Sequence, residues 1–288
     1  MSKRKNKSYE IIIEPKRSLF YIDWQGLLHY RDLLWLFVRR DFVVRYKQTI
    51  LGPAWFIINP LLTTFVFTIV FGRIAKLSTD KLPPFLFYLC GITIWGYFSR
   101  CISSTANSLI SHSHILQKVY FPRLIIPLSG IISNFFSFML QLFIFLGFYI
   151  YFKYFTVTGK LIDPQPHTLI VLPFIFLQTA FFALGVGLWV CALTIKYRDL
   201  LLAIEFLLQL WMYATPVIYP VSTIPAHFRF IMVFNPMSAI VDLFRYGFFG
   251  TVALSIKYLW CSVLITVGIL ISGLLIFHKV ERTFVDTI

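Results

Sequence analysis

The chain has 288 residues, of which 58% are hydrophobic and only 13% are charged. An ordinary soluble domain carries about 25% charged residues, so this composition cannot cover a water-facing surface. Lys and Arg outnumber Asp and Glu by 26 to 12, and the formal net charge is +14. Because apolar stretches of membrane-crossing length recur, this excess is better explained by the orientation of spans than by nucleic-acid binding. We therefore expect an all-α integral membrane protein with no nucleic-acid partner.

The first fifty residues are expected to form a separate cytoplasmic segment, followed by a membrane domain over residues 51–288. The basic N-terminus lacks the long apolar run of a cleaved signal peptide. Residues 24–47 mix large apolar side chains with charges, and a helical projection gathers most polar ones on one side. This pattern predicts an amphipathic helix in the cytoplasmic interface. The alternative is a basic stop before the first span.

Six segments are apolar and long enough to be proposed as membrane-crossing helices: residues 53–72, 85–110, 124–152, 169–195, 200–218 and 257–277. Residues 219–256 are too apolar for an ordinary loop and too interrupted by proline and glycine for one span. Irregular backbone at membrane depth must be buried in protein or line a cavity. We therefore expect a re-entrant helical pair between the fifth and sixth helices.

The distribution of Lys and Arg predicts the orientation. With both termini in the cytoplasm, 18 of these residues lie inside and 8 outside. Cytoplasmic loops of membrane proteins carry the excess of Lys and Arg. The chain is therefore predicted to be a multi-pass protein with both termini cytoplasmic.

Motifs for catalysis and metal binding are not found in the sequence. It contains no GxxxxGK[ST] phosphate loop, no HExxH and no GxSxG. The four cysteines form no CxxC pair, and His112 and His114 are more readily explained as solvated than as metal ligands. We expect no catalytic residue, no metal site and no cofactor in this chain. Glu205 is the only acid inside a proposed span, which disfavours a proton relay.

Five ordered segments resemble a known family. They are residues 45–62, QKVYFPRLIIPL at 117–128, KYRDL at 196–200, ATPVIYPVSTIP at 214–225 and FNPMSAIVDLFRYGFFG at 234–250. Together they resemble the ABC-2 type permeases of polysaccharide ABC exporters, which carry O-antigen, capsular polysaccharide or teichoic acid. The resemblance covers nearly the whole chain from about Trp24 onward.

The resemblance implies a coupling role for the loop around QKVYFPRL, which would enter a cleft of a separate ATPase subunit. Its Tyr-Phe pair would then supply buried anchors for that partner. The alternative is that the basic residues only fix the topology. The predicted partner-coupling residues are Lys118, Tyr120, Phe121 and Arg123, with Arg39 and Arg40 of the N-terminal helix.

The segment at 234–250 is predicted to begin a new helix, with Asn235 as N-cap and Pro236 at the first helical position. Asp242 and Arg245, three residues apart, would share a face and could form an ion pair. The family resemblance implies that this hairpin is the extracytoplasmic gate. A structural ion pair that only holds the hairpin is favoured over substrate contact.

The abundant aromatic residues suggest stacking against sugar rings, although most of them must face lipid or lie in interfacial belts. The similar family lines its conduit with the first and fifth spans. The predicted substrate-path residues are accordingly Trp55, Trp211, Tyr213 and Tyr219.

The resemblance implies a permease subunit that moves a lipid-linked polysaccharide across a bacterial inner membrane. It would act as a homodimer with two copies of an ABC ATPase, which would bind ATP and Mg in place of this chain. The alternatives are an ABC-2 permease for a drug or lipid, a membrane enzyme of polyprenyl-phosphate chemistry, and a scaffolding protein. The scarcity of acids predicted outside disfavours the enzyme.

Overall fold

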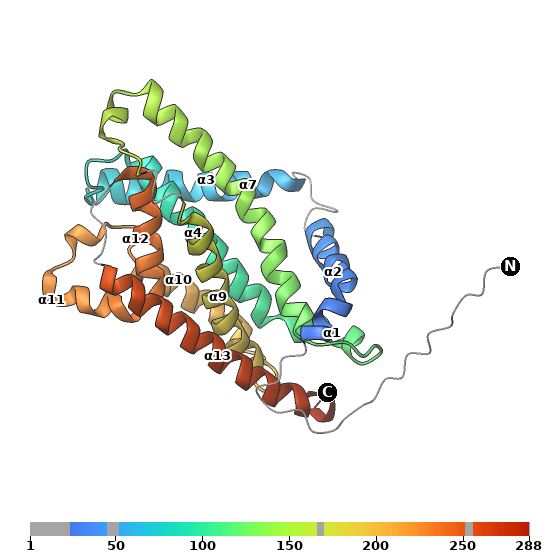
Figure 1. The fold of residues 1–288 in the computed structure, drawn as a ribbon. Coiled ribbons are helices and arrows are strands. Elements are labelled where there is room, and N and C mark those ends of the chain that lie inside the picture. The colour runs from blue at the N-terminus through green and yellow to red at the C-terminus, as the bar shows by residue number, and fades with distance from the viewer. Residues whose placement is uncertain (1–23, 45–51, 166–169, 251–255, 288) are drawn as a thin grey trace.

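The computed structural model describes residues 24–44, 52–165, 170–250 and 256–287, shown as the coloured ribbon in Figure 1. Within these ranges the chain consists of helices and connecting turns, without a β-strand. Backbone groups in lipid must be satisfied internally, which a helix achieves within one segment. The all-helical prediction is confirmed for these residues.

Five helices in the described ranges are long and apolar enough to cross a membrane. Each corresponds to a predicted span: α3 with its continuation η2 (Trp55–Phe67 and Thr68–Ile74), α4 (Pro84–Ala106), α7 (Ile125–Phe155), α9 (Leu172–Thr194) and α13 (Ile256–Thr287). The remaining predicted span corresponds to α10 (Leu200–Ala214), which has 15 residues. At 1.5 Å per residue it reaches about 22 Å, short of a hydrocarbon core of about 30 Å.

Shorter elements connect these helices. The chain begins with α1 (Trp24–His29) and α2 (Arg31–Val44), and η1 (Gly52–Ala54) precedes α3. Two single-turn helices, α5 (Ser108–Ser111) and α6 (Ser113–Leu116), follow α4, and η3 (Val157–Leu161) follows α7. After α10 come η4 (Val221–Thr223), α11 (Ala226–Arg229), η5 (Phe230–Phe234) and α12 (Pro236–Phe249).

Helix α4 lies at the centre of the molecule, where it contacts α3, α7, α9, α10 and α12. Helix α13 packs along α9, as Figure 1 shows. Small residues permit that close packing, because a Cβ added to Gly273 would lie 2.5 Å from the carbonyl oxygen of Gly185. Glycine at a crossing lets two membrane helices approach closely without a hydrophobic driving force.

A proline inside α3 is compensated by a neighbouring helix. Pro60 has no N–H to donate to the carbonyl of Phe56. The side-chain amide of Gln141 on α7 donates to this carbonyl, at 3.5 Å. The freed backbone group thus finds a donor on a neighbouring helix.

The non-helical backbone that follows α10 is held in place by one arginine of α12. Arg245 is 3% exposed, and its guanidinium donates to the carbonyls of Pro216, at 2.5 Å, and Val217. The same group lies 3.7 Å from the ring centroid of Phe87 on α4. Gly91 makes room for it, because a Cβ there would lie 2.8 Å from a guanidinium nitrogen. One buried cation therefore joins α12, α4 and the turn that ends α10.

Both ends of α12 are capped. The predicted N-cap is confirmed: the side chain of Asn235 accepts from the amide of Met237, and Pro236 is the first helical residue. At the other end, Gly250 adopts a φ of +65°, and a Cβ would lie 2.4 Å from the carbonyl oxygen of Asp163. The Tyr149 hydroxyl donates to the carbonyl of Phe248 at 2.9 Å. Helix α12 can therefore end inside protein without unsatisfied carbonyls at these positions.

Replacing Arg245 by Met should lower the melting temperature of the purified protein markedly. The substitution keeps an apolar stem of similar length but leaves two buried carbonyls without their donor, which costs roughly 1–3 kcal/mol for each group. Arg229→Met is the matched control, since Arg229 also donates to two carbonyls, those of Ile224 and Ser222, but in an exposed turn. Equal losses for the two variants in a thermal melt in detergent would contradict the role assigned to Arg245.

Candidate functional site

The loop that connects α6 to α7 carries most of the predicted coupling residues. Tyr120 is 76% exposed and Lys118 is exposed, whereas Phe121 is only 3% exposed. The ring of Phe121 lies 5.9 Å from that of Phe37 on α2 and packs in one cluster with Ile125. Packing against α2 already removes this ring from water, so it is not exposed to a partner in this structure, and a partner contact by Phe121 stays a prediction.

Arg123 joins the same loop to the far part of α13. Its guanidinium donates to the backbone carbonyl of Glu281, and its Nε lies 3.9 Å from the carboxylate oxygen of that residue. Only 16% of the Arg123 side chain is exposed. Of the four predicted coupling residues in this loop, Lys118 and Tyr120 are the accessible ones, while Phe121 and Arg123 hold the loop to α2 and α13.

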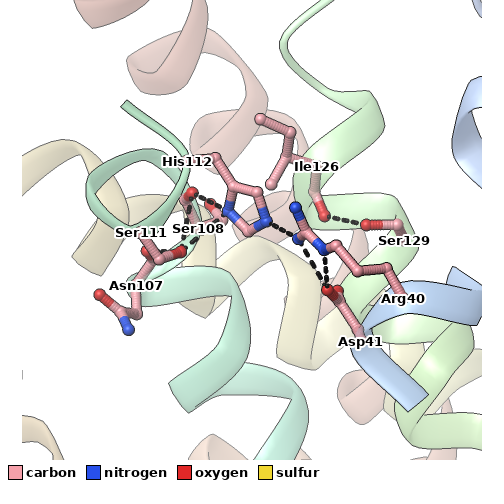
Figure 2. Close-up of polar contacts among 8 residues, drawn as sticks. All are labelled: Arg40, Asp41, Asn107, Ser108, Ser111, His112, Ile126 and Ser129. Atoms are coloured by element: carbon pink, nitrogen blue, oxygen red, sulfur yellow. Dashed lines mark hydrogen bonds and ion pairs between the residues drawn. The ribbon is translucent and has the colours of Figure 1, made fainter. Parts of the chain in front are cut away.

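The two predicted arginines of α2 differ in their surroundings. Arg39 is exposed. Arg40 donates to the carboxylate of Asp41 at 2.7 Å, and it also contacts Nε2 of His112, the residue that follows α5. Figure 2 shows Arg40 between these two partners. Arg40 thus connects the N-terminal helix to the end of α4 and α5.

His112 has a defined tautomer in this arrangement. Arginine can only donate, so Nε2 of a neutral His112 must accept from Arg40. The ring proton then resides on Nδ1, which lies 2.8 Å from the carbonyl oxygen of Ser108 and can donate to it. Burial, and to a smaller degree the charge of Arg40, lower the pKa of His112 below its ordinary 6.5. The neutral form is therefore favoured at pH 7.

A large polar cavity of about 830 Å³ lies beside this cluster. It is an open cavity lined by residues of α2, α3, α4, α5, α7 and α10, and we call it the polar cavity. Its polar lining is formed by Arg40, Asp41, Ser99, Arg100, Ser103, Ser104, Asn107, Ser108, Ser111, His112 and Glu205. Its apolar lining is formed by Val44, Phe56, Ile126, Leu201 and Ile204, with Gly130.

A smaller cavity of about 280 Å³ lies next to the polar cavity and shares Phe56 and Arg100 with it. Arg100 lies within α4, and its guanidinium donates to Oε1 of Gln141 at 2.9 Å. Asn134 on α7 donates to the carbonyl of Arg100 and to the hydroxyl of Ser104. A charged side chain within a membrane span is costly and marks a functional site by default.

The four predicted substrate-path aromatics differ in their surroundings. Trp55 is 49% exposed and lines the smaller cavity. Trp211 donates to the side chain of Asn235 and packs edge-on against Phe98. The hydroxyl of Tyr219 donates to the carbonyl of Tyr213. Among the described residues that line the two cavities, Trp55 is the only one of the four.

The predicted gate residues lie on α12, except for half-buried Asn235, which caps its start. Asn235 and Pro236 form the cap described above, and Asn235 also donates to the hydroxyl of Thr215. Asp242 and Arg245 are both buried. The Arg245 guanidinium is directed to the carbonyls at the end of α10, and its ion pair with Asp242 stays a prediction. In the described part of the chain, no group of three His, Cys, Asp or Glu side chains could hold a metal ion.

Sequence reasoning missed the polar stripe of α4 and α5. Its signal was present, since polar residues recur every four positions from the middle of the second predicted span onward. One row is Ser99, Ser103, Asn107 and Ser111, and the adjacent row is Arg100, Ser104 and Ser108. Side chains four apart share a helix face. A polar face in a membrane span predicts a cavity or a protein contact.

Comparison with known proteins identifies the class. Residues 32–249 match the family described as ABC-2 type transporter, so the chain belongs to that family.

Among its relatives, an O-antigen export system permease protein RfbA of Klebsiella pneumoniae is 28% identical, over 88% of this chain and 94% of the relative. The protein of the same name from Myxococcus xanthus is also 28% identical, over 91% and 97%. The capsule polysaccharide export inner-membrane protein CtrC of Neisseria meningitidis serogroup B is 24% identical, over 90% and 95%.

Phe121→Ala and Tyr120→Ala should differ in their effect on stability. Truncating a buried Phe typically costs about 3–5 kcal/mol, whereas Tyr120 makes few contacts within the chain that its loss could remove. A thermal melt of each purified variant should show a large decrease for Phe121→Ala and almost none for Tyr120→Ala. Equal melting temperatures for the two variants would place Phe121 outside the core.

Lowering the pH should decrease the stability of the folded protein, partly because His112 binds a proton more readily in the unfolded chain. Because its folded-state pKa is depressed, the unfolded chain binds a proton that folded His112 does not, once the pH falls below about 6.5. The free energy of unfolding therefore decreases as the pH falls through this window. His112→Gln, which keeps an acceptor for Arg40, should lose less melting temperature between pH 7.5 and 5.5 than the wild type. His227→Gln, at an exposed position, is the control and should lose as much melting temperature as the wild type. Identical losses of melting temperature for His112→Gln and wild type would contradict the role assigned to His112.

Proposed function

We propose that this chain is the permease subunit of an ATP-driven ABC exporter that carries a lipid-linked polysaccharide, of the O-antigen kind, across a bacterial inner membrane. The observation that carries the proposal is the match of almost the whole chain to permeases of O-antigen and capsule export. The family match over residues 32–249 supports the transporter class independently.

The proposed topology has six crossings with both termini in the cytoplasm. Five helices are long enough, and α10 with the irregular residues that follow it would complete the sixth crossing. In this arrangement α2 lies in the cytoplasmic interface, and α11 to α12 form a re-entrant pair that enters from outside. The 18 to 8 distribution of Lys and Arg supports this orientation.

ATP and Mg would be bound by a separate ATPase subunit, two copies of which would act on a homodimer of this chain. Exposed Lys118 and Tyr120 are the proposed contacts to that subunit, together with exposed Arg39 on the interface helix. The loop is packed on α2 through Phe121 and bonded to α13 through Arg123. A displacement of the loop by the ATPase would therefore move both helices together.

The proposed polysaccharide path runs between the two protomers and uses exposed aromatic faces. Trp55 and Tyr213 have exposed rings, at 49% and 42%, so they remain available for stacking. Trp211 is engaged with Asn235 and neighbouring aromatic rings, which favours a packing role for it. Weak contacts at several rings suit a long polymer that must slide.

A reconstituted complex tests the proposed function. The chain alone should show no ATPase activity, and with its ATPase subunit it should form a 2:2 complex. Lys118→Ala with Tyr120→Ala should weaken binding of that subunit about tenfold or more, because central anchors dominate interfaces. Surface polysaccharide per cell should fall accordingly at matched permease abundance.

Tyr154→Ala is the matched control for that experiment. Tyr154 is 72% exposed, near the opposite end of α7 from the coupling loop. The control should leave both complex formation and export unchanged. Nucleotide hydrolysis by the isolated chain, or full export by the loop variant, would contradict the proposal.

A further inference from the structure

A side-chain hydrogen bond joins two segments that lie far apart in the chain. The hydroxyl of Ser222 donates to a carboxylate oxygen of Asp80 at 2.6 Å, in an exposed setting. Asp80 belongs to the loop between η2 and α4, and Ser222 belongs to η4. In the proposed topology both residues lie on the outer side of the membrane. The contact therefore connects the start of α4 to the segment that follows Tyr219, a predicted substrate-path residue.

The turn that carries Asp80 is closed by two hydrogen bonds and anchored in the protein. The amide of Leu82 donates to the carbonyl of Thr79 at 3.0 Å, and the hydroxyl of Thr79 donates to the carbonyl of Leu82 at 2.8 Å. Both Thr79 and Leu82 are buried. Pro84 begins α4 only two residues later. The position of Asp80 is therefore fixed relative to α4.

The two residues at the tip of this turn have left-handed backbone conformations. Asp80 has a φ of +51° and Lys81 has a φ of +64°. Residues other than glycine adopt this region uncommonly, because their Cβ comes close to the following carbonyl oxygen. Strained conformations of this kind persist where the surrounding structure determines them, and they cluster at clamps and switch regions. The loop thus adopts an unfavourable backbone in presenting the Asp80 carboxylate to Ser222.

Ser222 belongs to a small unit formed by residues 221–229, which we call the outer flap. It contains η4 and α11. The guanidinium of Arg229 closes this unit, because it donates to the carbonyls of Ser222 and Ile224 at 3.3 and 2.9 Å. Helix α11 lies at the edge of the molecule (Figure 1), and the side chain of Phe228 is 51% exposed. The outer flap is bonded within itself, so that it can move as one piece.

The segment that contains the outer flap is attached to α4 in two different ways. Before the flap, buried Arg245 holds the carbonyls of Pro216 and Val217 while it stacks on α4. At the flap itself, the hydrogen bond between Ser222 and Asp80 is exposed, so water competes for both partners and reduces its net contribution to stability. An exposed contact of this kind can open and close while the buried contact stays in place.

We propose that the hydrogen bond between Asp80 and Ser222 is a releasable latch for the outer flap. The closed latch holds the flap against the loop that precedes α4. When the latch opens, the flap moves away and the outer end of the polysaccharide path opens. This inference rests on the proposed function and deepens it, because it names a contact that regulates the exit of the path.

Hydrogen exchange followed by mass spectrometry tests the latch without relying on transport. The full chain is assembled with its ATPase subunit in lipid nanodiscs. Asp80→Ala should raise the exchange rate of the amides in residues 221–229 at least about threefold, because local opening becomes more frequent. Ser222→Ala should have the same effect. Asp80→Asn, which keeps an acceptor oxygen at the same position, should raise the exchange rate less.

A double substitution distinguishes the latch from a general loosening of the loops. Both single changes remove the same contact, so the variant that combines Asp80→Ala with Ser222→Ala should exchange no faster than either single variant. Asp163→Ala is the matched control, since this acid of the proposed outer side accepts a hydrogen bond from Gln165, and it should leave the exchange of the flap unchanged. Additive effects of the two changes, or wild-type exchange in Asp80→Ala or Ser222→Ala, would overturn the proposal.

Ser222→Ala also covers the case in which Asp80→Ala does not fold. It removes one exposed hydroxyl and leaves the strained turn intact, so its melting temperature should be close to that of wild type. Faster exchange confined to residues 221–229 in this variant supports the latch. Faster exchange spread evenly over the whole chain would assign the contact to general stability and would overturn the latch.

A reversible cross-link tests whether release of the latch is needed for export. Asp80→Cys and Ser222→Cys are combined in a Cys261→Ala background, and the two thiols are joined by a bifunctional reagent that forms disulfides. Surface polysaccharide per cell should fall at least about tenfold when the flap is held closed, as expected for a blocked lid, and a reductant should restore it. Ser78→Cys with Asp80→Cys is the matched control, because this cross-link stays within one loop and should leave export unchanged.

The outcomes for the latch and for the proposed function are distinguishable. Undiminished export by the cross-linked protein would overturn the latch and leave the proposed function intact. Failure of the two thiols to cross-link would show that the two sites are not adjacent and would also overturn the latch. A wild type that exports no polysaccharide would overturn the proposed function and this regulation with it, whereas the exchange rates would still report whether the contact holds the flap.

Discussion

The contact between Arg245 and the carbonyls of Pro216 and Val217 allows this chain to interrupt its helices in the interior of the molecule. Carbonyls that lose their helical partners away from water must find another donor. Arg245 supplies it from α12, while its guanidinium stacks on Phe87 of the central helix α4. The position of α12, the end of α10 and the packing around Gly91 all depend on this one side chain. An arginine serves here because it offers several donors in a fixed plane and stacks on an aromatic ring.

Regular features of this fold were predictable because they have local causes. Long apolar stretches predicted six spans, five of which correspond to helices of membrane-crossing length, and Asn235 followed by Pro236 predicted the start of α12. The partner of Arg245 was not predictable in this way. Helical spacing indicated Asp242 as the ion-pair partner of Arg245. The guanidinium is directed instead to carbonyls almost thirty residues earlier in the chain, and no sequence spacing reveals such a contact.

The loop between α6 and α7, proposed as the coupling loop, shows that sequence cannot predict tertiary contacts even for two neighbouring residues. Tyr120 and Phe121 are adjacent aromatics, and both were expected to face a partner. Only the tertiary packing separates them, since Phe37 on α2 receives the Phe121 ring and leaves Tyr120 exposed. The polar stripe of α4, in contrast, has a four-residue period that a search for polar faces in the predicted spans would have detected.

In the proposed mechanism, the coupling loop and the polar cavity are connected through α2. The coupling loop contacts α2 through Phe121, and α2 contacts the lining of the polar cavity through Arg40 and His112. A movement of the loop would therefore change the cavity without a long chain of intermediates. Helix α12, whose role as a gate stays a prediction, also contacts α4.

The central claim is that residues 219–256 enter the membrane and leave it on the same side, and that Arg245 holds this segment from within. The accessibility of two engineered cysteines tests this claim most directly. Ser222→Cys and Lys257→Cys are made separately in a Cys261→Ala background, in which the other three native cysteines are buried. An impermeant thiol reagent applied to intact cells should label both sites from outside. Labelling of one of them only after the membrane is opened would show that the segment crosses, and would contradict the account.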